Sequence, residues 1–93
     1  MDTEKNLKTE LKNKVILVTG GSGSIGSALV ARLLKYPVKS VRVLDINEYE
    51  LFNLQRLIDN PKLRLFLGSV DDKDRVEIAC NGVDIILDRK SVV

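Results

Sequence analysis

A glycine-rich segment near the N-terminus carries the residues best suited to bind a ligand. Gly20, Gly23 and Gly26 recur at every third position, with serines among the residues between them. Glycine permits a tight turn and lets the main chain approach a ligand closely. Where such a turn opens a helix, the first N–H groups and the helix dipole attract phosphate. The sequence therefore predicts a pyrophosphate site at the N–H groups around Ser24 and Ile25. Gly20 is expected to make the turn, and Gly26 to let the helix pack against the sheet.

An acidic residue downstream fits the same ligand. Asp45 follows Gly26 by 19 residues and ends the next apolar run. A carboxylate about 20 residues after the last glycine accepts hydrogen bonds from the adenosine ribose of a dinucleotide. It would repel a 2′-phosphate, so NAD is favoured over NADP. The alternative is a purely structural turn with Asp45 in solvent. A P-loop is excluded, because Ser27 and Ala28 stand where it needs lysine and serine or threonine.

Hydrophobic periodicity predicts the elements that position these residues. Continuous apolar runs predict buried strands, and apolar residues three or four apart predict amphipathic helices. Strands are expected at residues 15–19, 41–45, 63–67 and 83–87, and helices at 24–36, 47–58 and 72–80. Asn47, followed by Glu50, is typical of a capping box. Asp71 or Asp72 is expected to cap the third helix, and Arg42 to point onto a sheet face rather than to a phosphate.

This alternation defines the fold class and the organisation of the chain. Strands separated by helices predict an α/β protein, a Rossmann-like doubly wound parallel sheet with the strand order 3-2-1-4. The succession β-α-β-α-β-α-β forms only the N-terminal half of such a fold. We expect a polar N-terminal arm at residues 1–13, a partial NAD(P)-binding Rossmann domain at residues 14–87, and a separate tail at residues 88–93.

Composition narrows the classes of function. The chain has 93 residues, is 44% hydrophobic and carries a net charge of +2, values that indicate a soluble globular protein without a nucleic-acid or membrane partner. It has no histidine, which excludes histidine catalysis. Its one cysteine, Cys80, suits a reducing cytoplasm and is expected in the core. No leader or membrane span is predicted. The acids at residues 71, 72 and 74 favour a helix start over a metal site.

The glycine-rich segment also resembles a known family. Thr-Gly-x-x-Gly-x-x-Gly after a strand is similar to the extended short-chain dehydrogenase/reductase superfamily. The fuller string at residues 17–29 resembles the CapD-like polysaccharide biosynthesis proteins, which are nucleotide-sugar 4,6-dehydratases and epimerases. Residues 45–51 and 61–76 resemble further segments of that family. The likeness covers roughly residues 12–87.

The resemblance implies a cofactor and its contacts. The cofactor would be NAD(P), and the parent enzyme would act on a UDP-sugar as a homo-oligomer. The pyrophosphate would be surrounded by Gly20, Ser22, Gly23, Ser24, Ile25 and Gly26. Asp45 and Asn47 would meet the adenosine ribose, and Ser69 and Val70 would lie along the adenine. The family usually has aspartate where this chain has Ser69.

The residues that catalyse the family's reaction are missing from the sequence. The family uses Tyr-x-x-x-Lys, in which tyrosine is the base and lysine lowers its pKa. Here Tyr36 is followed four residues later by Ser40, and Tyr49 by Asn53. We therefore expect no catalytic residue in this chain, which would form the NAD(P)-binding portion of the enzyme. The alternatives are a non-catalytic dinucleotide-binding regulatory module and a truncated product without function.

The last six residues depart from the family's pattern. The family continues after the fourth strand with a turn of small residues, whereas this chain has Asp-Arg-Lys-Ser-Val-Val. A charged tripeptide at the mouth of a buried strand is inconsistent with its surroundings. The same six residues are encoded by a common sequencing-adapter DNA. The hypothesis is that residues 88–93 are not native; a genuine short protein and a frameshift are the alternatives.

Overall fold

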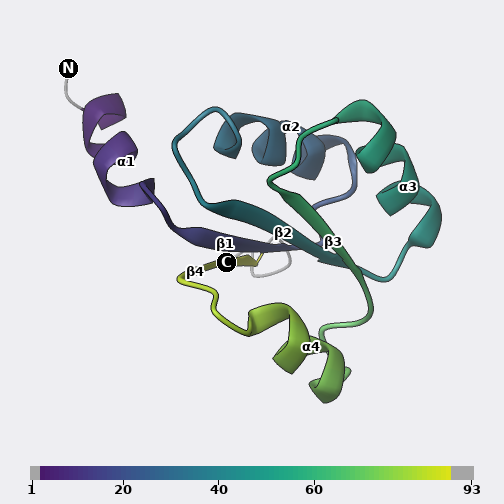
Figure 1. Cartoon of the computed structure of the whole chain (residues 1–93). Coiled ribbons are helices and arrows are strands. Elements are labelled where there is room, and N and C mark those ends of the chain that lie inside the picture. The colour runs from purple at the N-terminus through teal and green to yellow at the C-terminus, as the bar shows by residue number, and fades with distance from the viewer. Residues whose placement is uncertain (1–2, 89–93) are drawn as a thin grey trace.

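The computed structural model describes residues 3–88 and contains one parallel sheet with helices on both faces (Figure 1). Its strands are β1 (Val15–Thr19), β2 (Ser40–Asp45), β3 (Leu63–Leu67) and β4 (Ile85–Asp88). They lie in the order β3-β2-β1-β4, and all three pairings are parallel. The predicted fold class and strand order are confirmed.

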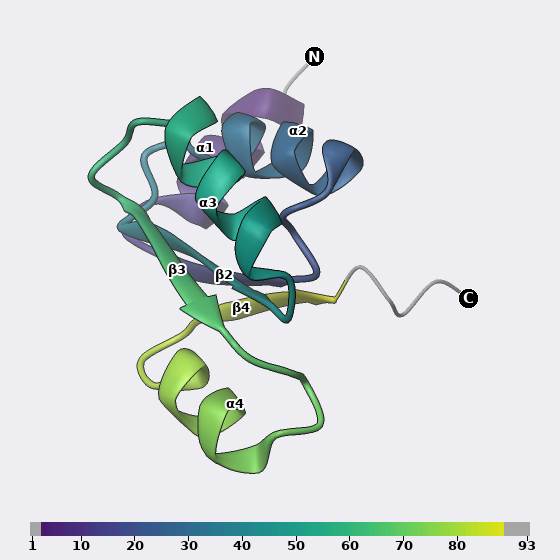
Figure 2. The ribbon, with the colours of Figure 1, turned by 90° about the vertical axis from the view of Figure 1, so that its right-hand side faces the viewer.

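The first face of the sheet packs against α2 (Ser24–Leu33) and α3 (Glu48–Leu57). Side chains that alternate along the strands, such as Ile16, Val18 and Val43, form one core with Val30 and Leu54 of these helices. Strict alternation is expected, since successive strand side chains point to opposite faces. Figure 2 shows α2 and α3 together on one side of the sheet and α4 on the other.

Within residues 3–88, α4 (Lys73–Cys80) is the one helix that covers the second face. Leu17, Leu44 and Ala79 form a smaller core there, and Cys80 packs against it half-buried. Crossing from β3 to β4 carries the chain to the far side of β1. A right-handed connection in that direction places its helix on the opposite face, which accounts for the position of α4.

The predicted elements are present, with shifted ends. The first predicted helix ends at Leu33 rather than Tyr36, because residues 34–36 continue as a turn before Pro37. The last strand begins at Ile85 rather than Val83. Asp84 accounts for the delay: its side chain accepts a hydrogen bond from the Val15 N–H, and its own N–H donates to the Val15 carbonyl.

Two parts of the sequence differ from expectation. Residues 3–11 of the predicted polar arm form a helix, α1 (Thr3–Leu11), and Leu11 is buried in the first core. Asp88, assigned to the tail, is the last residue of β4, and residues 89–93 lie outside the described part. Between residues 3 and 88, no helix has the length and apolar character needed to cross a membrane.

Candidate functional site

The glycine-rich turn joins β1 to α2 at the carboxyl edge of the sheet. Gly20 has a φ of +67°, a conformation that other residues rarely adopt, and its N–H donates to the Leu44 carbonyl at 2.9 Å. A Cβ on Gly26 would lie 2.6 Å from the backbone of Gly21. The first helical turn therefore packs against the glycine-rich turn itself, whereas the sequence led us to expect the sheet as its neighbour.

Gly23 leaves room for a ligand where the helix begins. A Cβ built on Gly23 meets no atom within 4 Å, so this side of the turn is open. Gly23 is also the N-cap of α2, and no side chain caps the helix. The first turn of α2 contains no acidic residue either. An open cradle at an uncapped helix start fits a pyrophosphate, in which backbone N–H groups would provide the donors.

Ser27 fixes the conformation of this turn, a role that was not predicted from the sequence. Its Oγ donates to the Gly23 carbonyl at 2.7 Å and lies 3.3 Å from the Ser22 carbonyl. These bonds keep the two carbonyl groups turned toward the helix. Serine bonding to the carbonyl four residues earlier is a common helical pattern, so the spacing was an available signal.

Asp45 and Ser22 are brought into contact across the sheet edge. Ser22 Oγ donates to Asp45 Oδ2 at 2.5 Å, and the Ser22 N–H lies 3.4 Å from the same oxygen. The Asn47 N–H donates to the other oxygen, Oδ1, at 3.0 Å. Partial burial acts to raise the Asp45 pKa, but the hydrogen bonds from Ser22, Asn47 and the Ile46 N–H outweigh burial and lower it. Asp45 is therefore a fixed carboxylate beside the turn.

The predicted capping box forms only in part. Asn47 caps α3, since its Oδ1 accepts the Glu50 N–H at 3.0 Å. The reciprocal bond from the Glu50 side chain to the Asn47 N–H is absent, because that N–H is donated to Asp45. Glu50 instead extends toward the glycine-rich turn, where Oε2 lies 3.5 Å from Ser22 Oγ. From the sequence, Glu50 was expected to act only in the capping box.

The loop after β3 lies next to Asp45. The Gly68 N–H donates to the Asp45 carbonyl at 2.9 Å, so Ser69 and Val70 follow directly at the same edge. Ser69 Oγ accepts the Asp71 N–H at 3.0 Å, and Val70 is exposed. Asp72, rather than Asp71, caps α4 through the Arg75 N–H. A contact between this loop and adenine stays a prediction.

On the other side of β1, the turn is bordered by Asp88. Thr19 Oγ1 donates to Asp88 Oδ1 at 2.8 Å, joining the ends of β1 and β4. The strand order reverses between these two strands, and ligands of open α/β sheets bind at such a switch point. The predicted site residues thus lie along one edge, with Asp45 and the residue 69–70 loop on one side and Asp88 on the other.

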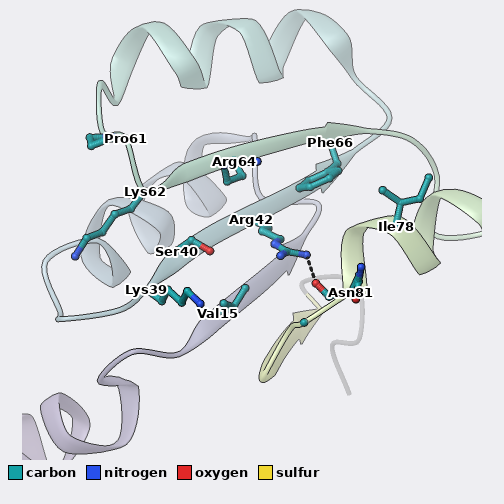
Figure 3. Close-up of a pocket in the computed structure, with 11 residues that line it drawn as sticks. Val15, Lys39, Ser40, Arg42, Pro61, Lys62, Arg64, Phe66, Ile78 and Asn81 are labelled. Carbon is teal, nitrogen blue, oxygen red and sulfur yellow. Dashed lines mark hydrogen bonds between the residues drawn. The ribbon is translucent and has the colours of Figure 1, made fainter.

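A cavity lies at the opposite, amino-terminal edge of the sheet (Figure 3). Its volume is about 510 Å³, and its lining includes Lys39, Arg42, Lys62 and Arg64. Arg42 donates to the carbonyls of Ala79 and Asn81 at 2.9 and 2.6 Å and lies 5.8 Å from the ring centre of Phe66. Figure 3 shows it directed toward Asn81. As expected, Arg42 is on a sheet face away from the phosphate site, and it holds the C-terminal end of α4.

Comparison with known proteins identifies relatives for most of the chain. The model of the polysaccharide biosynthesis protein family matches residues 16–90. A Methanocaldococcus jannaschii protein described as an uncharacterized membrane protein is 52% identical over 75 residues, which cover 81% of this chain and 22% of that protein. The UDP-glucose 4-epimerase of Rickettsia bellii is 31% identical, with 80% of this chain and 23% of the enzyme covered.

Among solved structures, the Bordetella bronchiseptica enzyme WbmF is similar in both fold and sequence. Its complex with NAD⁺ has a TM-score of 0.67 and 28% identity, covering 85% of this chain and 23% of WbmF. WbmF has also been solved with NAD⁺ and UDP. The chain thus spans less than a quarter of the length of each of these three relatives.

Proposed function

The chain belongs to the family of polysaccharide biosynthesis proteins, and on that basis we propose that it is the NAD-binding portion of a nucleotide-sugar epimerase or dehydratase. The observation that carries the proposal is the open cradle at Gly23, which lies at an uncapped helix start. The Ser22–Asp45 pair beside it provides a fixed carboxylate. The complexes of WbmF with NAD⁺ and with NAD⁺ and UDP support it.

Different residues of the chain would contact different parts of the cofactor. The N–H groups at the start of α2 would bind the pyrophosphate, with Ser22, Ser24 and Ile25 around it. Asp45 would accept hydrogen bonds from the adenosine ribose, assisted by Asn47. Bound NAD⁺ would supply the hydride acceptor for oxidation of the sugar. Ser69 and Val70 would border the adenine.

The sugar chemistry itself requires residues that this chain lacks. Neither Tyr36 nor Tyr49 is followed by the lysine of Tyr-x-x-x-Lys. We propose that the complete enzyme carries this pair and a UDP-sugar site in its remaining length, and that it acts in the cytoplasm, where NAD is available.

A regulatory module would need the same dinucleotide site without the tyrosine and lysine. Two experiments distinguish the enzyme from the regulatory module. The gene is sequenced past the codon for Leu87 by an adapter-free method, and the encoded protein is assayed for conversion of UDP-sugars.

Gly23→Val tests the dinucleotide site directly. The Cβ of the valine would have no protein atom within 4 Å, and the extended backbone of Gly23 accepts a side chain, so we expect the fold to remain intact. We expect NAD to bind the wild-type chain weakly and the variant at least about tenfold more weakly, because the side chain occupies the pyrophosphate space. Calorimetric titration measures both affinities.

Gly23→Ala provides a graded control for this titration. Its smaller side chain should reduce the affinity less than valine does, and circular dichroism should show the same fold for all three proteins. Equal heats of NAD binding for the wild type and Gly23→Val would contradict the assignment of this turn.

A further inference from the structure

A second carboxylate faces the glycine-rich turn beside Asp45. Glu50 Oε2 lies 3.5 Å from Ser22 Oγ, the same hydroxyl that donates to Asp45 Oδ2 at 2.5 Å. One hydroxyl proton serves one acceptor at a time, and the short bond gives it to Asp45. Among residues 3–88, no lysine or arginine pairs with Glu50. Arg56 lines a cavity together with Ser22, but its guanidinium lies over the Phe52 ring, 5.8 Å from the ring centre. The Glu50 carboxylate therefore faces the turn without an ion-pair partner among these residues.

The local structure explains why Glu50 reaches this position. A glutamate at the third position of a helix normally turns back to the N–H of the N-cap residue. Here the Asn47 N–H is already donated to Asp45 Oδ1 at 3.0 Å. Glu50 is thereby released from capping, and its side chain extends across the gap between α3 and the turn that begins α2. Asp45 thus sets the position of the second carboxylate.

We propose that Glu50 is a specificity-determining residue which, together with Asp45, excludes a dinucleotide that carries a 2′-phosphate. The inference rests on the proposed NAD site, in which Asp45 meets the adenosine ribose. A phosphate monoester adds between one and two negative charges near neutral pH. Placed on that ribose, it would face two carboxylates and no cation between residues 3 and 88 that pairs with them. The 2′-hydroxyl of NAD brings no such repulsion.

The substitution Glu50→Gln removes this charge while keeping the size of the side chain. Glu48→Gln is the matched control: it removes the same charge from the same first turn of α3, and among residues 3–88 Glu48 forms no hydrogen bond with Ser22. Calorimetry with NAD and with NADP gives the ratio of the two dissociation constants for each protein. We expect Glu50→Gln to shift this ratio about tenfold in favour of NADP, Glu48→Gln to leave it within about twofold, and NAD affinity to change little.

Ionic strength provides an independent readout. Asp45 and Glu50 are half-buried, so salt screens their repulsion of a phosphate in part. The preference of the wild type for NAD over NADP should therefore decrease between about 0.05 and 0.5 M salt, and the preference of Glu50→Gln should decrease less. Equal ratios of the NADP and NAD dissociation constants in Glu50→Gln and Glu48→Gln would overturn the role of Glu50. If the wild type binds NAD in that case, the proposed dinucleotide site is still supported. A wild-type chain that binds neither dinucleotide overturns both proposals.

Discussion

At the level of the single residue, the carboxylate of Asp45 has a structural role and a proposed role in ligand binding. It holds the glycine-rich turn through Ser22 and the start of α3 through the Asn47 N–H. It is also the group proposed to meet the adenosine ribose. Burial opposes its charge, and the hydrogen bonds more than compensate, so the pKa of Asp45 is lower in the folded chain than in the unfolded chain. The site is therefore already organised around a negative charge before a ligand arrives.

This lowered pKa predicts a dependence of stability on pH. The folded state holds the Asp45 proton less tightly than the unfolded state, so Asp45 stabilises the fold above its unfolded pKa. That contribution is lost as the pH falls through the lower, folded pKa. Between about pH 5 and pH 2, the wild type should lose more free energy of unfolding than Asp45→Asn does. Urea unfolding at a series of pH values measures the difference.

Asp59→Asn is the control for this series, because Asp59 is exposed and no hydrogen bond to its carboxylate occurs within the described residues. Its unfolding free energy should follow the wild type through the acid range. Parallel curves for the wild type and Asp45→Asn would refute the stabilising role of the Asp45 charge.

At the level of elements, the start of α2 is fixed by contact with the turn that precedes it. Gly26 lies in the first helical turn, where alanine would ordinarily be favoured by about 1 kcal/mol. Here a Cβ would lie 2.6 Å from the backbone of Gly21, whereas the equivalent Cβ at Gly23 meets nothing. Glycine is therefore needed at these two positions for different reasons: at Gly26 it leaves space for the protein backbone, and at Gly23 it leaves space for a ligand.

Substitution by alanine at each of these two glycines should therefore affect the free energy of unfolding differently. Gly26→Ala should lower the free energy of unfolding by about 1–3 kcal/mol, because the backbone of the turn must move. Gly23→Ala should change it by less than about 0.5 kcal/mol, as is usual for a substitution that meets no neighbour. Chemical denaturation measures both. A Gly26→Ala variant as stable as Gly23→Ala would mean that the turn yields to the added methyl group.

At the level of the whole molecule, the two faces of the sheet are stabilised unequally. The first core contains residues from α1, α2 and α3, whereas in the described part of the chain only α4 covers the second face, with a much smaller core. Arg42 compensates in part: it extends from β2 and donates to two carbonyls at the C-terminal end of α4. The loop that leads from β3 into α4 carries Ser69 and Val70, so the attachment of α4 also affects the proposed adenine contact.

Arg42→Met should loosen α4 selectively. Loss of the two charged hydrogen bonds should cost about 1–2 kcal/mol and speed hydrogen exchange in α4 more than in β1. Arg64 is the matched control: it is the register partner of Arg42 in β3 and is exposed. Arg64→Met should leave the exchange of α4 unchanged. Exchange that rises equally in α4 and β1 would show that Arg42 stabilises the whole fold rather than this helix.

Much of this structure follows from local patterns in the sequence. The apolar runs determined the strands, the glycine spacing determined the turn, and Asn47 and the acids at residues 71 and 72 indicated the helix starts. These features depend on near neighbours in the chain, and alternation of strands and helices then leaves few topologies. The strand order and the position of the glycine-rich turn at the carboxyl edge could be predicted for that reason.

Only the tertiary structure decided which side chains meet at the site. Ser22 is 23 residues from Asp45 and 28 from Glu50 in sequence, and their contacts depend on how β2 and α3 pack beside the turn. The burial of Leu11 and the bond from Arg42 to Ala79 likewise join distant segments. Local conformational preferences do not determine such long-range contacts, because a side chain such as Glu50 has several partners within reach. Packing selects among them by removing the alternatives, as Asp45 does when it takes the Asn47 N–H.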